Sequence, residues 1–480
     1  MLSREEIVTG LQKIIPSHQV ITEEQLLKEY SIDRYYKVES IWGIYSLPTP
    51  AAIVKPSNTQ EVANILMFCN ENLINVVPRT GGSATEGGLE TAVENSIVLD
   101  GSDMKKIINI DTYNMQATVE CGVVLETLEN EVRALGFTTG HSPQSKPLAQ
   151  LGGLTATRST GQFSTLYGGI EELIVGLEAV FPNGQITRIK NVPRRAAGPD
   201  IRHVIVGNEG TMSFITEVTI KLFKYYPENH QFYGYILDDM ELGFKLIHDV
   251  ITAGYRPSVV RLYSPEDAHY HFSHFHEGKA VLLFMAEGPK GIVEATSKAI
   301  EEIVGKANIQ QVDSKHIANW FYSLNWDEKK VEEERIEVKE TNNCGFTTEV
   351  SANWSAIYPI YKNSIDRIRK EIPDLTLLGA HSSHSYINGT NLYFVYYYDM
   401  KCKPEEEMSK YHDPIQNIIV EETLKAGGSM CHHHGVGKHR THFLAEEYGN
   451  SLYILKELKK AFDPKGIMNK GTIFGLNEKL

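Results

Sequence analysis

Residues 75–88 read Asn-Val-Val-Pro-Arg-Thr-Gly-Gly-Ser-Ala-Thr-Glu-Gly-Gly, a short apolar run that passes directly into a glycine-dense loop. A strand followed by such a loop can present several backbone N–H groups to an anion, because glycine lacks Cβ and tolerates positive φ. The loop lacks the Gly-x-Gly-x-x-Gly of a Rossmann fingerprint and the Gly-Lys-Ser/Thr that closes a P-loop. On this stretch alone, an anion-binding loop and a purely structural turn are equally good interpretations.

The segments on both sides of this loop predict a domain of short strands and helices. Apolar residues recur on one helical face over 59–72. Strands are predicted at 51–54, 75–78, 96–100 and 114–122, and another helix at 125–135. Residues 48–223 are therefore predicted to form one α+β domain. A helical arm is predicted over 1–47, where Ser3 and Glu6 fit a capping box.

The chain changes character at Pro227, where surrounding polar residues mark a boundary. Beyond it, strand-like runs alternate with longer helical patterns. The predicted strands lie at 231–237, 280–286 and 391–398, and the predicted helices at 241–253, 292–305, 358–370, 409–426 and 451–462. This order predicts a second α+β domain over 224–430 and a C-terminal segment over 431–480.

Composition narrows the class of protein. A chain of 480 residues can form two or three domains, and 41% hydrophobic and 22% charged residues are typical of a globular protein. The net charge of -14 argues against a nucleic-acid partner. The five cysteines are scattered and odd in number, which favours a reducing compartment, and we expect a cytoplasmic location. Neither a signal peptide nor a transmembrane segment is predicted, because no apolar run reaches about 18 residues.

A second unusual stretch lies near the C-terminus, where residues 431–440 read Cys-His-His-His-Gly-Val-Gly-Lys-His-Arg. Imidazole titrates near neutrality and can donate, accept or ligate. Three interpretations stay open on these residues alone: a metal site, a solvated polar loop and a histidine-rich wall of an active site. Adjacent residues on one short segment rarely converge on one ion, so no metal is expected.

Three further motifs follow the first loop, at 139–161, 168–184 and 198–217. In this order and spacing, the four motifs resemble the FAD-binding domain of the vanillyl-alcohol-oxidase flavoprotein family, the PCMH-type fold. The resemblance implies two α+β subdomains, with the FAD pyrophosphate on the first loop. It assigns to FAD the residues Pro78, Arg79, Thr80, Gly81, Gly82, Ser83, Ala84, His141, Gln144, Ser145, Gln150, Gly153, Thr157, Arg158, Ser159, Thr160, Glu209, Gly210 and Ile215. Some members attach the flavin through a histidine where this chain has Ser83, so noncovalent FAD is expected.

Stretches of the second domain, at 256–262, 391–394 and 429–438, extend the resemblance. They are similar to the alkyl-dihydroxyacetonephosphate-synthase-like subgroup and to bacterial FAD-linked oxidoreductases of unassigned substrate. The resemblance implies a cap domain with an antiparallel sheet that binds the substrate. It assigns catalytic roles to Arg261, Tyr393, His432, His433 and His434, and substrate-binding roles to His381, His384 and Lys438.

His381 stands where the synthase-like members carry a substrate-binding arginine. Arginine is always charged and grips phosphate or carboxylate with two bonds, and histidine does neither reliably near neutral pH. We therefore predict a FAD-linked oxidoreductase that oxidises the CH–OH group of a hydroxy acid or sugar-derived molecule by hydride transfer to flavin N5. The alternatives are an ether-forming transferase that uses FAD without net redox, and a flavin-binding scaffold without turnover. The predicted partners are a small-molecule substrate and an unidentified electron acceptor, and a homodimer is allowed.

Overall fold

The N-terminal arm begins with α1 (Arg4–Leu11), and its predicted capping box is confirmed. In the computed structural model, which describes residues 2–33, 38–276, 278–324 and 326–478, the Ser3 hydroxyl accepts the Glu6 N–H and the Glu6 carboxylate accepts the Ser3 N–H. A second short helix, α2 (Glu24–Glu29), follows. Residues 1 and 34–37 of the predicted arm, and 479–480 of the predicted C-terminal segment, lie outside the described residues.

The first sheet carries the glycine loop at the end of one of its strands. Its order is β1 (Val20–Ile21), β2 (Ala52–Val54), β4 (Ile97–Asp100) and β3 (Val76–Arg79), and β2, β4 and β3 run parallel. The helix α3 (Thr59–Asn72) forms over the predicted residues, and the side chain of its N-cap Asn58 accepts the Glu61 N–H. Because β3 ends at Arg79, the chain enters the glycine loop at the carboxyl end of a parallel strand.

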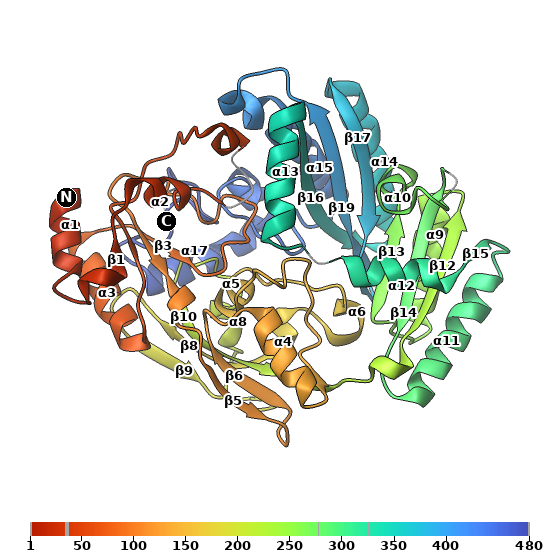
Figure 1. Ribbon diagram of the computed structural model, residues 1–480, viewed down its shortest axis with the longest axis horizontal. Helices are drawn as coiled ribbons and strands as arrows, with labels where there is room; N and C mark the ends of the chain where they lie inside the picture. The colour runs from red at the N-terminus through yellow and green to blue at the C-terminus, as the bar shows by residue number, and fades with distance from the viewer. Residues whose placement is uncertain (1, 34–37, 277, 325, 479–480) are drawn as a thin grey trace.

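The second sheet is antiparallel and completes the first domain (Figure 1). Its order is β5 (Ile107–Asp111), β6 (Gln116–Glu120), β10 (Phe214–Lys221), β8 (Ile174–Val180) and β9 (Ile186–Ile189). The helices α4 (Leu125–Ala134) and α5 (Leu151–Ala156) share one hydrophobic core with these strands. A two-strand ribbon of β7 (Phe137–Thr138) and β11 (Phe223–Lys224) then leads to the second domain.

The second domain is built on a large antiparallel sheet. Its order is β15 (Gln310–Val312), β12 (Gln231–Leu237), β14 (Ala280–Ala286), β13 (Val259–Tyr263), β17 (Leu375–Ser382), β19 (Gly389–Asp399) and β16 (Asn343–Asn353), with β18 (Ser385–Tyr386) beside β19. One face packs in a single core with α9 (Met240–Thr252), α11 (Lys290–Gly305), α14 (Trp354–Glu371) and α15 (Asp413–Lys425). The opposite face contacts α10 (Pro265–Phe272) and α12 (Ser314–Ser323) near β13 and β14, and farther along it is free to form a site.

Several elements differ from the sequence prediction. The helix predicted over 409–426 begins instead with a π-helical turn, Met408–His412, and becomes α15 only at Asp413. The strands β8, β13, β16 and β17 and the helix α13 (Glu328–Thr341) were not predicted as elements. A strand such as β8 is buried at every position, so it lacks the alternation that reveals a half-buried strand.

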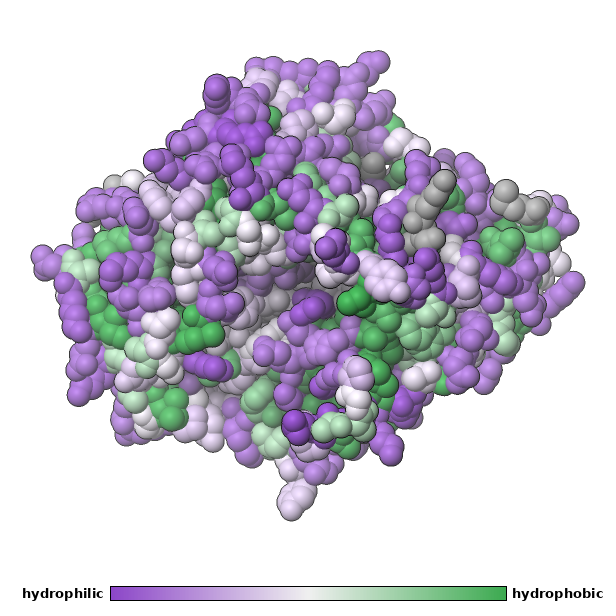
Figure 2. Space-filling model, turned by 180° about the vertical axis from the view of Figure 1, so that it is seen from behind, coloured by the Kyte–Doolittle hydropathy of each residue, from purple (hydrophilic) through white to green (hydrophobic). Residues whose placement is uncertain are grey.

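The C-terminal segment returns to the first domain (Figure 1). The helices α16 (Leu444–Tyr448) and α17 (Leu452–Phe462) lead to residues whose backbone pairs with β3, where Val76 N–H donates to Ile467 O at 2.8 Å. The mixed α+β architecture is confirmed, while the predicted domain boundaries stay predictions. Polar side chains cover most of the face seen in Figure 2. Within the described part of the chain, no helix has the length and apolar character needed to cross a membrane.

Candidate active site

The register of the large sheet brings four side chains into one row. Tyr263 of β13 pairs with His381 of β17, His381 pairs with Tyr393 of β19, and Tyr393 pairs with Glu349 of β16. Directly paired residues of an antiparallel sheet point to the same face. Arg261 lies two residues before Tyr263 and therefore shares that face, opposite the helix-covered core.

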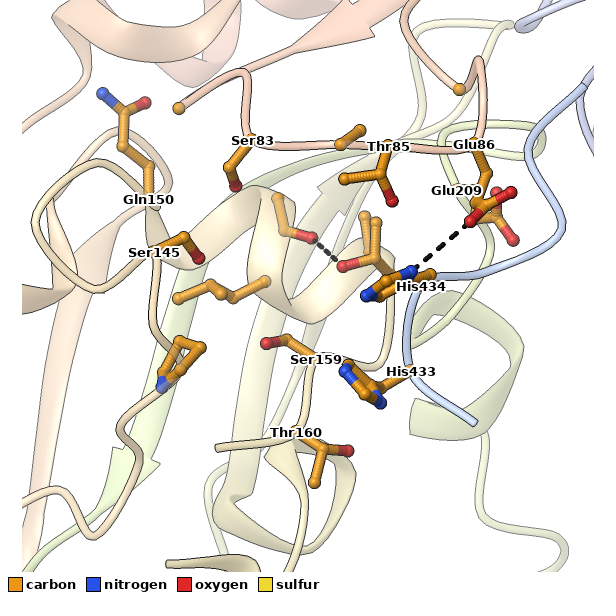
Figure 3. A pocket seen from close by; sticks show the side chains of 18 of the residues that line it. Ser83, Thr85, Glu86, Ser145, Gln150, Ser159, Thr160, Glu209, His433 and His434 are labelled. Carbon is orange, nitrogen blue, oxygen red and sulfur yellow. Dashed lines mark hydrogen bonds and ion pairs between the residues drawn. The ribbon is translucent and has the colours of Figure 1, made fainter. Parts of the chain in front are cut away.

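A cavity lies between this row and the glycine loop. Figure 3 shows Ser83 and Thr85 of the loop on one side of it and His433 and His434 facing them. The predicted residues on its wall are Pro78, Arg79, Thr80, Gly81, Gly82, Ser83, Ala84, Gln144, Ser145, Gln150, Gly153, Thr157, Ser159, Thr160, Glu209, Gly210, Ile215, Arg261, His381, His384, Tyr393, His433 and His434. The structure thus brings together most of the predicted cofactor, substrate and catalytic residues.

Four predicted residues do not lie on this wall. His141 is buried behind it, and neither of its ring nitrogens has a hydrogen-bond partner among the described residues. Arg158 pairs with Glu171 at 3.2 Å near the surface. Lys438 donates to Thr472 Oγ1 at 2.7 Å and to the Gly87 carbonyl at 3.1 Å, so its ammonium group supports the glycine loop. His432 Nε2 lies 2.7 Å from Tyr386 Oη.

The glycine loop packs closely against the segment 148–150 while lining the cavity. A Cβ on Gly81 would lie 2.5 Å from the Leu148 carbonyl oxygen, and Gly82 has a φ of +71°. Larger residues would therefore shift the loop or strain it. The side-chain oxygens of Gln150 and Gln162, on the same wall, are buried without a partner among the described residues. These acceptors and the exposed loop backbone fit a polar dinucleotide such as FAD.

The histidine triplet wraps around a buried carboxylate that sequence reasoning missed. Glu349 is fully buried and accepts the backbone N–H groups of His432, of His433 at 3.1 Å and of His434 at 2.9 Å. Three amides on one carboxylate fix the path of the triplet. No local signal in the sequence marks Glu349, because its role depends on the register between β16 and β19.

Two more carboxylates, from the first domain, hold the residues after the triplet. Glu86 accepts Arg440 Nη2 at 2.7 Å and Arg440 Nε at 3.0 Å. Burial favours a higher pKa for Glu86, but the Arg440 charge, with His434 and His439, outweighs it and holds the pKa well below its usual range. Glu209 accepts the N–H groups of Val436 and Gly437, both at 2.8 Å, and burial raises its pKa to about 7.

A histidine cluster forms where His384 meets the triplet. His384 stacks on His432 with ring centroids 5.0 Å apart, and His432 Nδ1 lies 2.8 Å from His433 Nδ1. One nitrogen from each of these three rings lies within 4.8 Å of the others, a set that could hold a metal ion. The triplet thus gains a convergent partner that its sequence did not indicate, because the turn after β17 supplies His384, and the expectation of no metal stays a prediction. Burial lowers the pKa of all three rings, that of His432 to about 4.

His381 and Tyr393 form the centre of the wall, with ring centroids 4.8 Å apart. His381 Nδ1 lies 2.6 Å from Oδ2 of Asp267, a buried residue of α10 that sequence reasoning also missed. Tyr393 Oη accepts the Thr347 hydroxyl at 2.9 Å, and burial raises the pKa of Tyr393 to about 12. Both groups are thus uncharged near neutral pH, since burial also lowers the pKa of His381.

Arg261 places a buried positive charge on the wall. Arg261 is only 5% exposed, and its Nη1 donates to Tyr263 Oη at 2.8 Å. Among the described residues, its Nε has no hydrogen-bond partner, and its Nη1 partner is a phenol and not a carboxylate. The guanidinium carbon lies 5.4 Å from the Trp320 ring. A ligand that enters the cavity therefore meets an uncompensated cation.

Comparison with known proteins places this geometry in a family. A family model described as FAD binding domain matches residues 50–190, and one described as FAD linked oxidases, C-terminal domain, matches residues 226–473. The chain belongs to the FAD-linked oxidase family. It is 60% identical over 482 residues to the uncharacterized FAD-linked oxidoreductase YgcU of Escherichia coli (strain K12), covering 99% of this chain and 100% of that protein.

More distant relatives confirm the predicted fold and subgroup. Alkyldihydroxyacetonephosphate synthase of Dictyostelium discoideum is 25% identical, over 88% of this chain and 72% of that protein. A solved structure of an alkyldihydroxyacetonephosphate synthase aligns with a TM-score of 0.76 at 22% identity, covering 98% of this chain and 85% of that one. p-Cresol methylhydroxylase aligns with a TM-score of 0.75 at 17% identity, covering 99% and 98%. The PCMH-type fold is thereby confirmed, and the two family models and the 60% identical relative confirm the FAD cofactor and the FAD-linked oxidoreductase class.

Proposed function

We propose that this FAD-linked oxidoreductase oxidises a hydroxylated small molecule that carries an anionic group, namely a 2-hydroxy acid or a sugar-derived acid. The observation that carries the proposal is the unpaired Arg261 guanidinium on the cavity wall. A buried charge without a counter-ion costs several kcal/mol, so the site favours a ligand that supplies the anion. A carboxylate meets the planar guanidinium with two parallel hydrogen bonds.

The groups beside Arg261 suit oxidation of a neighbouring hydroxyl. When bound, FAD supplies the two-electron oxidant that accepts hydride from the hydroxyl-bearing carbon, so that a 2-hydroxy acid becomes a 2-oxo acid. The protein must bind the anion, orient the hydroxyl and accept its proton. His381, Tyr393, His433 and His434 line the wall within the same cavity and can hold or move that proton.

Two relatives support a hydroxy acid as the substrate. Glycolate oxidase subunit GlcD of Bacillus subtilis (strain 168) is 26% identical over 88% of this chain, and the mitochondrial D-lactate dehydrogenase [cytochrome] of Arabidopsis thaliana is 26% identical over 98%. Both are named for small 2-hydroxy acids. Their names therefore indicate the class of substrate to test first.

The synthase-like relatives support the rival, an ether-forming transferase that leaves FAD oxidised. His381 on the cavity wall argues against the transferase, because burial lowers the pKa of this histidine and its Nδ1 is hydrogen-bonded to Asp267. A neutral imidazole is a poor clamp for the phosphate of an acylated dihydroxyacetone phosphate. The redox reaction is therefore the stronger proposal.

We also propose that FAD is held without a covalent bond, because Ser83 occupies the loop position from which some family members attach the flavin. Denaturing the enzyme should release all of the flavin into a protein-free filtrate. The five cysteines are all unpaired, which supports a cytoplasmic location. A homodimer remains a proposal that light scattering of the purified enzyme tests.

A steady-state screen tests the substrate class. The enzyme is supplied with an artificial electron-accepting dye and offered pairs of compounds, each a 2-hydroxy acid and the matching neutral alcohol without the carboxylate. The proposal predicts dye reduction with at least one acid and much weaker reduction with its neutral partner. Reduction by neutral alcohols alone, or by none of the compounds, rejects an anionic hydroxy substrate.

A further inference from the structure

We propose that Asp267 orients His381 as the base that takes the substrate hydroxyl proton, an inference that rests on the proposed function and names its proton acceptor. The two side chains are 2% and 9% exposed, and His381 Nδ1 lies 2.6 Å from Asp267 Oδ2. An ionised carboxylate can only accept, so Nδ1 carries the proton of this hydrogen bond. The other ring nitrogen, Nε2, then keeps its lone pair and can act as a base.

Three other groups on the wall, His433, His434 and Tyr393, are less suited to this role. His433 Nδ1 lies 3.6 Å from Glu349 and His434 Nδ1 lies 3.4 Å from Glu86, both longer than the contact at His381. Those two carboxylates are also occupied, Glu349 by the backbone of the triplet and Glu86 by Arg440. A phenol with a pKa near 12, as burial gives Tyr393, holds its proton at neutral pH.

The backbone around the pair is arranged to keep this geometry. The helix α10 starts beside β17, where Ser264 N–H donates to the Ala380 carbonyl at 2.8 Å and Ala380 N–H donates to Ser264 Oγ at 3.1 Å. A Cβ on Gly379 would lie 2.8 Å from the Asp267 nitrogen, so glycine at this position permits the close approach of helix and strand. A base must be held within narrow limits to be effective, and this packing supplies that constraint.

The titratable groups that face His381 come from three elements and from His384 in the turn after β17. Those on the three elements are Asp267 and His271 of α10, Arg261 and Tyr263 of β13, and Tyr393 of β19. In the reaction, the substrate O–H bond breaks and its proton passes to Nε2. The oxygen electron pair forms the carbonyl as the hydride leaves the carbon for the oxidant already named. The imidazolium that results is stabilised by Asp267, while Arg261 stays with the substrate carboxylate.

The substitution Asp267→Asn tests the pair. An asparagine amide can donate to Nδ1, which would leave the proton on Nε2 and remove the base. In the FAD-loaded enzyme we expect flavin reduction by the substrate to slow by about 10²–10⁴-fold, while the dissociation constant of the unreactive 2-oxo acid product changes far less. His381→Asn should lose about as much, and the double variant no more than either, because residues that act as a unit are not additive. Glu266→Gln, a neighbouring carboxylate that pairs with Arg369, is the matched control and should keep the wild-type rate.

A second measurement reads the tautomer without turnover. Magnetic resonance of isotope-labelled histidine in the FAD-loaded enzyme, with the His381 signal assigned by its absence in His381→Asn, should show the proton on Nδ1 in the wild type and on Nε2 in Asp267→Asn. A proton on Nε2 in the wild type, or a wild-type rate of flavin reduction in Asp267→Asn, overturns the proposed role of the Asp267–His381 pair. Neither result overturns the proposed function. If no hydroxy acid reduces the wild-type flavin, the proposed function fails and the base role fails with it, whatever the tautomer.

Discussion

Glu86 and Arg440 form a buried two-point ion pair that joins the glycine loop to the histidine segment, 354 residues apart in sequence. Arg440 is fully buried and also donates to the carbonyls of Glu349 at 3.0 Å and Met430 at 2.7 Å. One guanidinium thus ties together both domains and the loop that carries the triplet. The geometry of the cavity depends on this connection.

Replacing Arg440 with methionine should destabilise the enzyme strongly. The Glu86 carboxylate would stay buried without its main counter-charge, at a cost of about 3–5 kcal/mol. Denaturant unfolding of the FAD-loaded enzyme measures the loss. Arg369→Met is the control, because Arg369 pairs with Glu266 at the surface and such pairs contribute about 1 kcal/mol or less. Similar losses in the two variants would contradict a structural role specific to Arg440.

Glu349→Gln should loosen the histidine triplet. The neutral amide accepts through one oxygen where the carboxylate uses two for the amides of residues 432–434, and hydrogen bonds to charged groups contribute about 1.5–3 kcal/mol. Hydrogen exchange of those amides should therefore accelerate by about tenfold or more. Glu421→Gln, at a half-exposed position that pairs with Arg367, should leave the exchange unchanged. Unaltered protection of the triplet in Glu349→Gln would show that other contacts hold it.

Arg261→Met should weaken binding of the anionic substrate. Loss of one partner of a buried charge pair costs about 2–5 kcal/mol, so the dissociation constant of a 2-oxo acid should rise by about 30-fold or more. Arg261→Lys keeps the charge but loses the planar fork, and should fall between methionine and wild type. Titration of the flavin absorbance measures both. A neutral analogue without the carboxylate is the control ligand, and equal losses for the two ligands would contradict a carboxylate at Arg261.

Stability should fall as the pH rises through the titration of Glu209. Burial raises the folded-state pKa from 4.5 to about 7, so the folded protein holds a proton that the unfolded chain has released. The stabilisation is complete below about pH 4.5 and is lost as the pH rises towards about 7, up to about 3 kcal/mol. Glu209→Gln should flatten the unfolding free energy over this range. The prediction is contradicted if the wild-type free energy of unfolding instead rises between about pH 4.5 and 7 and Glu209→Gln abolishes that rise.

Some elements of the first domain, such as α3 and β3, could be predicted because their signals are local. The helix α3 is amphipathic and capped by Asn58, and β3 leads into glycines whose backbone freedom is visible in the sequence. The cavity wall could be named only through the family resemblance, which indicated Arg261, Tyr393 and the triplet. The structure brings these residues together and shows why Lys438 lies elsewhere, under the glycine loop.

Glu349 and Asp267 could not be predicted, for a physical reason. Glu349 acts on amides about 83 residues away, and Asp267 acts on an imidazole 114 residues away. Each contact depends on strand register and helix packing. The local sequence around a single acidic residue does not reveal either of these. The same limit applies to His384, whose meeting with the triplet depends on a turn between β17 and β19.

Anaerobic mixing of the FAD-loaded enzyme with 2-hydroxy acids tests the central claim most directly. The account predicts that at least one acid bleaches the visible flavin absorbance in a single turnover and yields one 2-oxo acid for each flavin reduced. Flavin that stays oxidised with every hydroxy acid, while an acylated dihydroxyacetone phosphate and a fatty alcohol yield an ether, would contradict it.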